Sequence, residues 1–114
     1  MIYTNNPCVV AAYPCSHFVN GSVCDVYVAV RNAIHKGAQL VSYPVSGSIK
    51  PNATPYKSVV ITTAGDQLDF NSLQIIEDAI NLLSRLPHKH HQYDESILED
   101  FRIIDLDHLD AAIR

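Results

Sequence analysis

Residues 57–86 read "KSVVITTAGDQLDFNSLQIIEDAINLLSRL" and hold the two clearest structural signals of this 114-residue chain. Val, Ile and Thr dominate residues 58–63, a composition that favours a β-strand. From about Phe70 to Leu86, apolar residues recur at intervals of three and four, which predicts an amphipathic helix that Pro87 ends. A strand that runs into a helix is the basic unit of α/β folds.

The chain before this unit predicts further strands and helices. "MIYT", residues 1–4, favours a short strand, and Asn6 can cap a helix that starts at Pro7. The β-branched run "VCDVYVAV", residues 23–30, favours a strand that continues into a helix ending at Lys36 and Gly37. Residues 38–42, "AQLVS", predict one more brief strand.

The chain after residue 92 predicts a short helix over 95–101, an edge strand over 102–106 and a final helix over 107–114. Strands that alternate with helices over this length indicate one domain, residues 1–114. We therefore expect an α/β fold, a small three-layer domain with a mostly parallel central sheet of about four to five strands and helices on both faces.

The composition is that of an ordinary globular protein, with 47% apolar and 18% charged residues. No apolar run is long enough to cross a bilayer, and no basic segment followed by an apolar core opens the chain. We therefore expect no membrane association and a cytoplasmic location. Cys8, Cys15 and Cys24 are odd in number, lack CxxC spacing and have apolar neighbours, which indicates reduced thiols with structural roles.

Charge is distributed unevenly along the chain. Residues 1–65 contain four basic residues against Asp25 alone, a net charge of +3, whereas residues 66–114 contain four against eleven acids, a net charge of −7. An acidic total argues against a nucleic-acid partner, because a general nucleic-acid binder needs a broad basic face. The local positive balance of the first half suits a small anion better.

The positive half contains "YPVSGSIKPNATPYKS", residues 43–58, a stretch without acids that is longer than most connections. Gly47 between Ser46 and Ser48 lets backbone N–H groups and hydroxyls point into one concavity. Lys50 adds a mobile positive charge. These four residues predict a cradle for a carboxylate or phosphate. The alternative is a proline-braced connection whose serines cap its own turns.

Asn5 is expected to share this site. Ligands of α/β sheets bind beyond the carboxyl ends of the strands, and both "TNNP", residues 4–7, and the 43–58 loop follow predicted strands. If these two strands run parallel in one sheet, Asn5 lies on the same rim as the loop and its amide can orient the ligand.

The chain contains no P-loop, GxGxxG or GxSxG motif, so the catalytic residues stay unknown and enzymatic activity stays open. His88, His90 and His91 lie in a polar linker, without cysteine or carboxylate partners at the spacing of a structural zinc site. We therefore expect neither a stoichiometric metal nor a cofactor.

Three segments carry a resemblance to one family. They are "TNNP" (4–7), "VRNAIHKGAQLVSYPVSGSIKPNATPYKSVVI" (30–61) and "LDFNSLQIIEDAI" (68–80), and together they resemble the GrdX family. The resemblance spans most of residues 2–82, to which residues 8–24 add little, and "GSIKPNATPYKS" is its most specific part. It implies a cytoplasmic accessory protein, encoded beside glycine, sarcosine or betaine reductase genes in amino-acid-fermenting anaerobes. It supplies no catalytic residue.

These observations favour an accessory protein of reductive amino-acid metabolism that binds a small anion or a protein partner, such as a glycine reductase component. The alternative is a small enzyme that acts on a carboxylate or phosphate through the 43–58 loop, where Lys50 and the serines act electrostatically. A third hypothesis is a partner module whose acidic C-terminal half docks on a basic surface.

Overall fold

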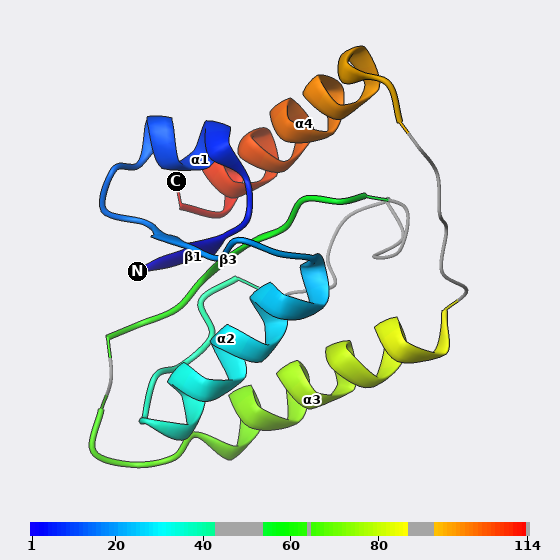
Figure 1. Ribbon diagram of the computed structural model, residues 1–114. Helices are drawn as coiled ribbons and strands as arrows, with labels where there is room; N and C mark the ends of the chain where they lie inside the picture. Colours follow the sequence, from blue (N-terminus) through cyan, green and yellow to red (C-terminus); the bar gives the residue numbers. More distant parts are fainter. Residues whose placement is uncertain (43–53, 64, 87–92, 114) are drawn as a thin grey trace.

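The computed structural model describes residues 1–42, 54–63, 65–86 and 93–113. A mixed sheet of three strands, in the order β2-β1-β3, lies at its centre (Figure 1). β1 (Ile2–Thr4) pairs in parallel with β2 (His17–Phe18) and in antiparallel with β3 (Ser58–Val60). An isolated antiparallel bridge from Leu40 to Ile61 follows β3.

Helices lie on both sides of this sheet (Figure 1). α2 (Val23–His35) packs against β1 and β3, and α3 (Phe70–Arg85) packs along α2. α1 (Pro7–Ala12) and α4 (Glu95–Ile113) lie together on the opposite side, where α4 contacts β3.

The strands divide the apolar core in two because their side chains alternate between the faces. Val59 and Ile61 join the larger cluster, which α2 and α3 complete. Ile2 packs on the other face with Val9 of α1 and Leu109 of α4. Each face of the sheet is therefore covered by its own pair of helices.

The prediction of an α/β domain with a mostly parallel sheet of about four to five strands is wrong. The described strands are three in number, two or three residues long, and one of the two pairings is antiparallel. Residues 38–42, predicted as a strand, form only the isolated bridge. The helices, rather than a long ladder, supply most of the buried apolar residues.

The strand predicted over residues 23–30 is also wrong, because this run is the first part of α2. Its buried residues, Val23, Val26, Tyr27, Val30 and Ile34, follow helical spacing, so β-branched composition misled the prediction. The helix starts where the Ser22 side chain accepts from the backbone N–H of Asp25 and the Asp25 carboxylate accepts from that of Ser22.

The edge strand predicted over 102–106 is likewise absent, since one continuous helix, α4, covers Glu95–Ile113. Asp105 and Leu109, four residues apart, are its buried positions and face the sheet. Two adjacent isoleucines suggested a strand, but both Ile103 and Ile104 are exposed on the helix.

Two helix predictions are confirmed. Asn6 caps α1, since its Oδ1 accepts a 3.0 Å hydrogen bond from the backbone N–H of Cys8, and Pro7 is the first helical residue. α3 covers Phe70–Arg85, and its cap is Asp69, which accepts from the backbone N–H of Ser72 at 3.1 Å.

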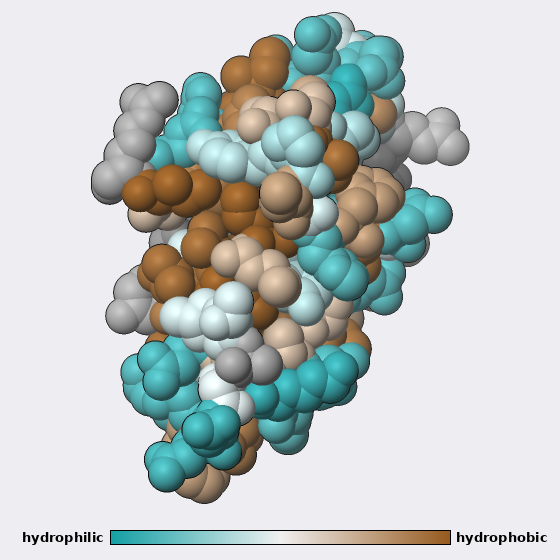
Figure 2. Space-filling view, turned by 90° about the vertical axis from the view of Figure 1, so that its left-hand side faces the viewer, coloured by the Kyte–Doolittle hydropathy of each residue, from teal (hydrophilic) through white to brown (hydrophobic). Residues whose placement is uncertain are grey.

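The three cysteines are free. Cys8 is half-buried, but Cys15 and Cys24 are exposed, so the structural role expected for all three does not fit these two. Figure 2 shows apolar groups gathered in a band across the side on which the N-terminal end lies, between polar ends. Within the described ranges, no helix combines the length and the apolar character needed to cross a bilayer.

Gly37 ends α2 and brings the chain against Gly65. Its φ is +101°, a region that residues with a Cβ rarely adopt, and a Cβ added here would lie 2.2 Å from the carbonyl oxygen of Gly65. Gly65 has no positive φ, and a Cβ on it would lie 3.1 Å from the carbonyl oxygen of Gly37.

We predict that Gly37→Ala lowers the free energy of unfolding by roughly 2–4 kcal/mol, because strain and a backbone clash add together. Gly65→Ala, the matched control, should cost clearly less. Urea denaturation followed by circular dichroism measures both, and equal losses would contradict the role given to the φ of Gly37.

Candidate functional site

A buried polar cluster lies where β1 ends. It consists of Thr4, Asn6, Ser58 and Asp105, and each of these residues is at most 8% exposed. Asp105 of α4 accepts three hydrogen bonds: from the Ser58 N–H at 3.1 Å, from the Ser58 hydroxyl at 2.7 Å and from Asn6 Nδ2 at 3.1 Å. This carboxylate therefore joins α4 to β3 and to the start of α1.

The hydrogen bonds of this cluster run in one direction. Because a carboxylate only accepts hydrogen bonds, the Ser58 hydroxyl donates its single hydrogen to Asp105. Thr4 must then donate to Ser58 across the 2.7 Å that separates their hydroxyl oxygens. Thr4 in turn accepts from the Asn6 backbone N–H at 3.0 Å. The polar groups are thus engaged with one another, which suits structural support rather than acid–base chemistry.

Asn5 fastens the returning end of the predicted loop to β1. Its Nδ2 donates to the carbonyl oxygens of Gly21 at 2.9 Å and Pro55 at 2.8 Å, and its Oδ1 accepts from the Lys57 N–H at 2.9 Å. Asn5 is 6% exposed. Both amide hydrogens are used inside the protein, so Asn5 positions residues 54–57.

The departing end of the loop heads toward the same end of the sheet. Residues 39–42 run antiparallel to β3, with the Val41 N–H bonded to the Val60 oxygen at 2.8 Å and the Ser42 hydroxyl accepting from the Val60 N–H at 2.9 Å. β3 is itself antiparallel to β1, so this segment points the same way as β1. Residues 39–42 thus run toward the end of the sheet at which β1 ends, and residues 54–57 lie beside that same end.

A small cavity of about 30 Å³ lies between these two chain ends. Ser42, Lys57, Ser58, Asp105 and His108 line it, and we call this set the loop base. Its volume is about that of one water molecule.

Lys57 is the unusual charge of the loop base. Burial lowers the pKa of the half-buried Lys57 below its ordinary value, and the negative charge of Asp105 opposes that shift. No ion pair joins Lys57 to a carboxylate of the described ranges. Burial and then Asp105 also raise the pKa of Tyr27 above its ordinary value, so that hydroxyl stays neutral.

Of the five residues predicted for the site, only Asn5 belongs to the described part of the chain. Ser46, Gly47, Ser48 and Lys50 lie outside it. Sequence reasoning missed Lys57 and Asp105. Lys57 belongs to the 43–58 stretch, but no pattern around it marks burial. Asp105 was placed in the predicted edge strand 102–106 and counted among the acids of the C-terminal half.

Metal-binding side chains do not gather in groups of three or more within the described ranges. His88, His90 and His91 lie outside them, so the expectation that their linker binds no metal stays a prediction.

Fold and site together define a small α+β protein, with a mixed sheet between helices and a partly buried cation at one end of the sheet. A family model described as GrdX-like protein matches residues 1–114, so the chain belongs to the GrdX-like protein family. This confirms the resemblance and extends it to the whole chain. Membership suggests an accessory protein associated with glycine reductase. Searches of curated proteins and of solved structures gave no match.

We predict that Asp105→Ala lowers the free energy of unfolding by about 3 kcal/mol, because it leaves the buried donors of Ser58 and Asn6 without an acceptor. The matched control is the exposed Asp107, two residues further along α4. Asp107→Ala should change the free energy of unfolding by no more than about 0.5 kcal/mol. Thermal and urea unfolding measure both. Similar effects of the two substitutions would show that the cluster contributes little.

Proposed function

We propose that this GrdX-like chain is a cytoplasmic accessory protein of glycine reductase-type metabolism that binds a small anion at the loop base and catalyses no reaction itself. The observation that supports anion binding most directly is Lys57, a half-buried cation without an ion-pair partner in the described ranges. A buried ammonium is costly unless opposite charge offsets its burial. The Asp105 carboxylate offsets only part of it, because the pKa of Lys57 is still lowered, and a bound anion would supply further negative charge.

The loop supplies the remaining ligands in this proposal. One end is tied to Val60 of β3 through Ser42, and the other end is tied to Asn5 at the end of β1. Ser46, Gly47, Ser48 and Lys50 then complete the site with hydroxyls, backbone N–H groups and a second ammonium. Asn5 contributes by holding residues 54–57 in place.

The Asp105 cluster supports binding rather than catalysis. Its carboxylate already accepts three hydrogen bonds, so it is a poor general base for a substrate at the loop base. The enzyme hypothesis requires another acid–base group or nucleophile. Turnover of acetyl phosphate by purified protein, abolished by Lys57→Met, would favour the enzyme over the accessory role.

We predict that Lys57→Met weakens anion binding at least about ten-fold without lowering stability. Burial lowers the folded-state pKa of Lys57 below that of the unfolded chain, so protonation of this amine is less favourable in the fold than in the unfolded chain. The parent should gain stability as pH rises from the folded toward the unfolded pKa, and Lys57→Met should lose that gain. Calorimetry with phosphate, sulfate, glycine and acetyl phosphate gives affinity, and urea titrations across alkaline pH give stability.

The exposed Lys36 provides the control for this substitution, because Lys36→Gln removes an equal charge far from the loop base along the chain. It should leave the affinity for inorganic anions unchanged. The proposal is contradicted if the parent and Lys57→Met bind the anions with equal affinity, or if Lys57→Met markedly lowers the free energy of unfolding.

We also predict that Lys50→Ala weakens binding of the same anions by about ten- to a hundred-fold while the fold is retained. Gly47→Val should weaken it further, because a β-branched residue resists positive φ and blocks close backbone approach. Calorimetry on the parent and both variants decides this. If the parent binds no anion of the panel, or Lys50→Ala binds as well as the parent, the 43–58 loop is only a connection.

A protein partner is the second candidate, favoured by the apolar band of Figure 2 and by exposed apolar residues such as Met1, Phe18 and Val41. Glycine reductase components are the partners that family membership suggests. Sedimentation of the chain mixed with each purified component separates this candidate from anion binding, since it needs no small ligand.

A further inference from the structure

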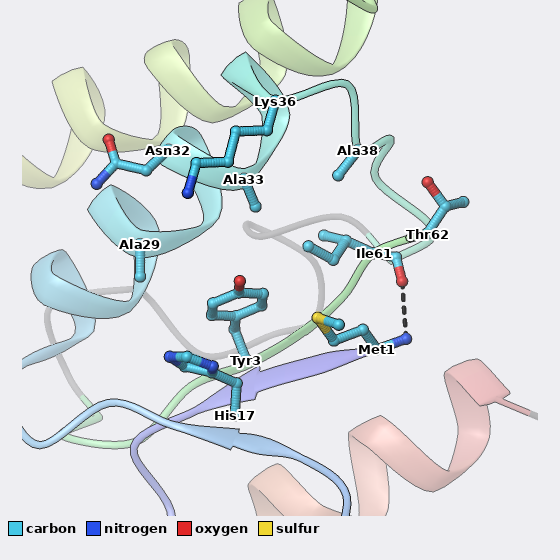
Figure 3. Close-up of a pocket in the computed structure, with 10 residues that line it drawn as sticks. All are labelled: Met1, Tyr3, His17, Ala29, Asn32, Ala33, Lys36, Ala38, Ile61 and Thr62. Carbon is cyan, nitrogen blue, oxygen red and sulfur yellow. Dashed lines mark hydrogen bonds between the residues drawn. The ribbon is translucent and has the colours of Figure 1, made fainter. Parts of the chain in front are cut away.

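A second hollow lies on the other face of the sheet, between β1, β2 and α2. Its volume is about 330 Å³, about eleven times that of the cavity at the loop base, and lies at the lower end of the range for small-molecule sites. None of the residues that line it belongs to the loop base. Its walls are built from Tyr3 and His17 below, α2 above, and Ile61 with Thr62 at one side (Figure 3).

The room exists because small side chains face it. Ala29 and Ala33, one helical turn apart on α2, and Ala38 after the helix line the hollow where larger residues would fill it. Ile61 and Met1 add further apolar surface. A ligand bound here would therefore place an apolar body against these groups.

Two polar groups converge over this apolar surface. Figure 3 shows the Tyr3 hydroxyl pointing up from the sheet toward α2, and the Lys36 side chain folded back so that its ammonium points toward that hydroxyl. The half-buried Tyr3 has no hydrogen-bond partner for its hydroxyl within the described ranges, although such hydroxyls usually have one. Lys36 likewise has no ion-pair partner there.

The ring of His17 holds Tyr3 in this orientation. The two rings lie with their centroids 4.6 Å apart and their planes 31° from parallel, so His17 covers one side of Tyr3. Asn32, four residues before Lys36, adds an amide at the mouth. No acidic residue is among the residues that line the hollow.

We infer that this hollow binds a small organic carboxylate, with its apolar part on Ala29, Ala33 and Ile61 and its carboxylate between the Lys36 ammonium and the Tyr3 hydroxyl. One ammonium and one hydroxyl match the single charge and the two acceptor oxygens of a carboxylate. A doubly charged phosphate would lose more hydration against the alanines than these two groups return. This site is distinct from the loop base, with which it shares no residue.

The test uses benzoate as the carboxylate and benzamide as its neutral isostere. Calorimetry gives affinities, and amide chemical shifts locate binding. Benzoate should bind and shift the signals of residues around Ala29, Ala33 and Ile61, while benzamide should bind at least about ten-fold more weakly. Lys36→Gln should weaken benzoate binding about ten-fold, and Tyr3→Phe several-fold.

Two further variants guard against indirect effects. Ala29→Leu keeps helix propensity and fills the hollow, so it should abolish benzoate binding while circular dichroism and thermal stability remain those of the parent. Arg85→Gln, an exposed cation at the end of α3, should bind as the parent does.

The proposal is overturned if the parent does not bind benzoate, if benzamide binds equally well, or if Lys36→Gln and Ala29→Leu both bind as the parent does. Lys57→Met should leave the affinity for benzoate unchanged. The experiment can therefore reject the proposed anion site at the loop base and the proposed carboxylate site in this hollow independently of each other.

Discussion

The carboxylate of Asp105 is the contact on which the assembly of this small fold depends. It is buried 47 residues along the chain from Ser58 and 99 from Asn6, and it accepts hydrogen bonds from both. Burial of a charge costs much free energy unless donors such as these surround it. Burial of the donors is costly as well unless an acceptor bonds to them. The sheet has few ladder hydrogen bonds of its own, so this one group fixes how α4 sits on β3 and where α1 begins.

The same cluster gives a structural role to the residues of "TNNP" and to the end of the 43–58 stretch. "TNNP" contributes Thr4 and Asn6 to the cluster and Asn5 to the tie on residues 54–57. The described part of the loop ends in Lys57 and Ser58, one facing the small cavity and the other bound to Asp105. Structural support and the candidate anion site therefore share adjacent residues, which accounts for a half-buried lysine in a protein of this size.

Local signals were predictable from sequence, and long-range partners were not. Asn6 before Pro7 and the spacing of α3 depend on neighbours within a few residues, so these elements were found. Residues 23–30 were misassigned because valine composition outweighed the Ser22–Asp25 cap, and Asp105 because nothing nearby in sequence marks it as buried. For the site, Asn5 lies just after β1, but its three hydrogen bonds belong to the protein itself, and its role in binding a ligand stays a prediction. No sequence motif marks the hollow beneath α2. Its alanines and Tyr3 are far apart in the sequence and come together only where β1, β2 and α2 pack.

The distance in sequence between Asn6 and its partner Asp105 in α4 also dictates an order of events during synthesis. β1 ends at Thr4, yet Asn6, two residues later, reaches the Asp105 carboxylate only when residue 105 is available. Until then the cluster of α2, α3 and β3 can form its own core, while the face of the sheet that meets α1 and α4 stays open to water. Contacts at such a large separation in sequence predict slow closure of this face, and a nascent chain whose sheet face stays exposed until α4 leaves the ribosome.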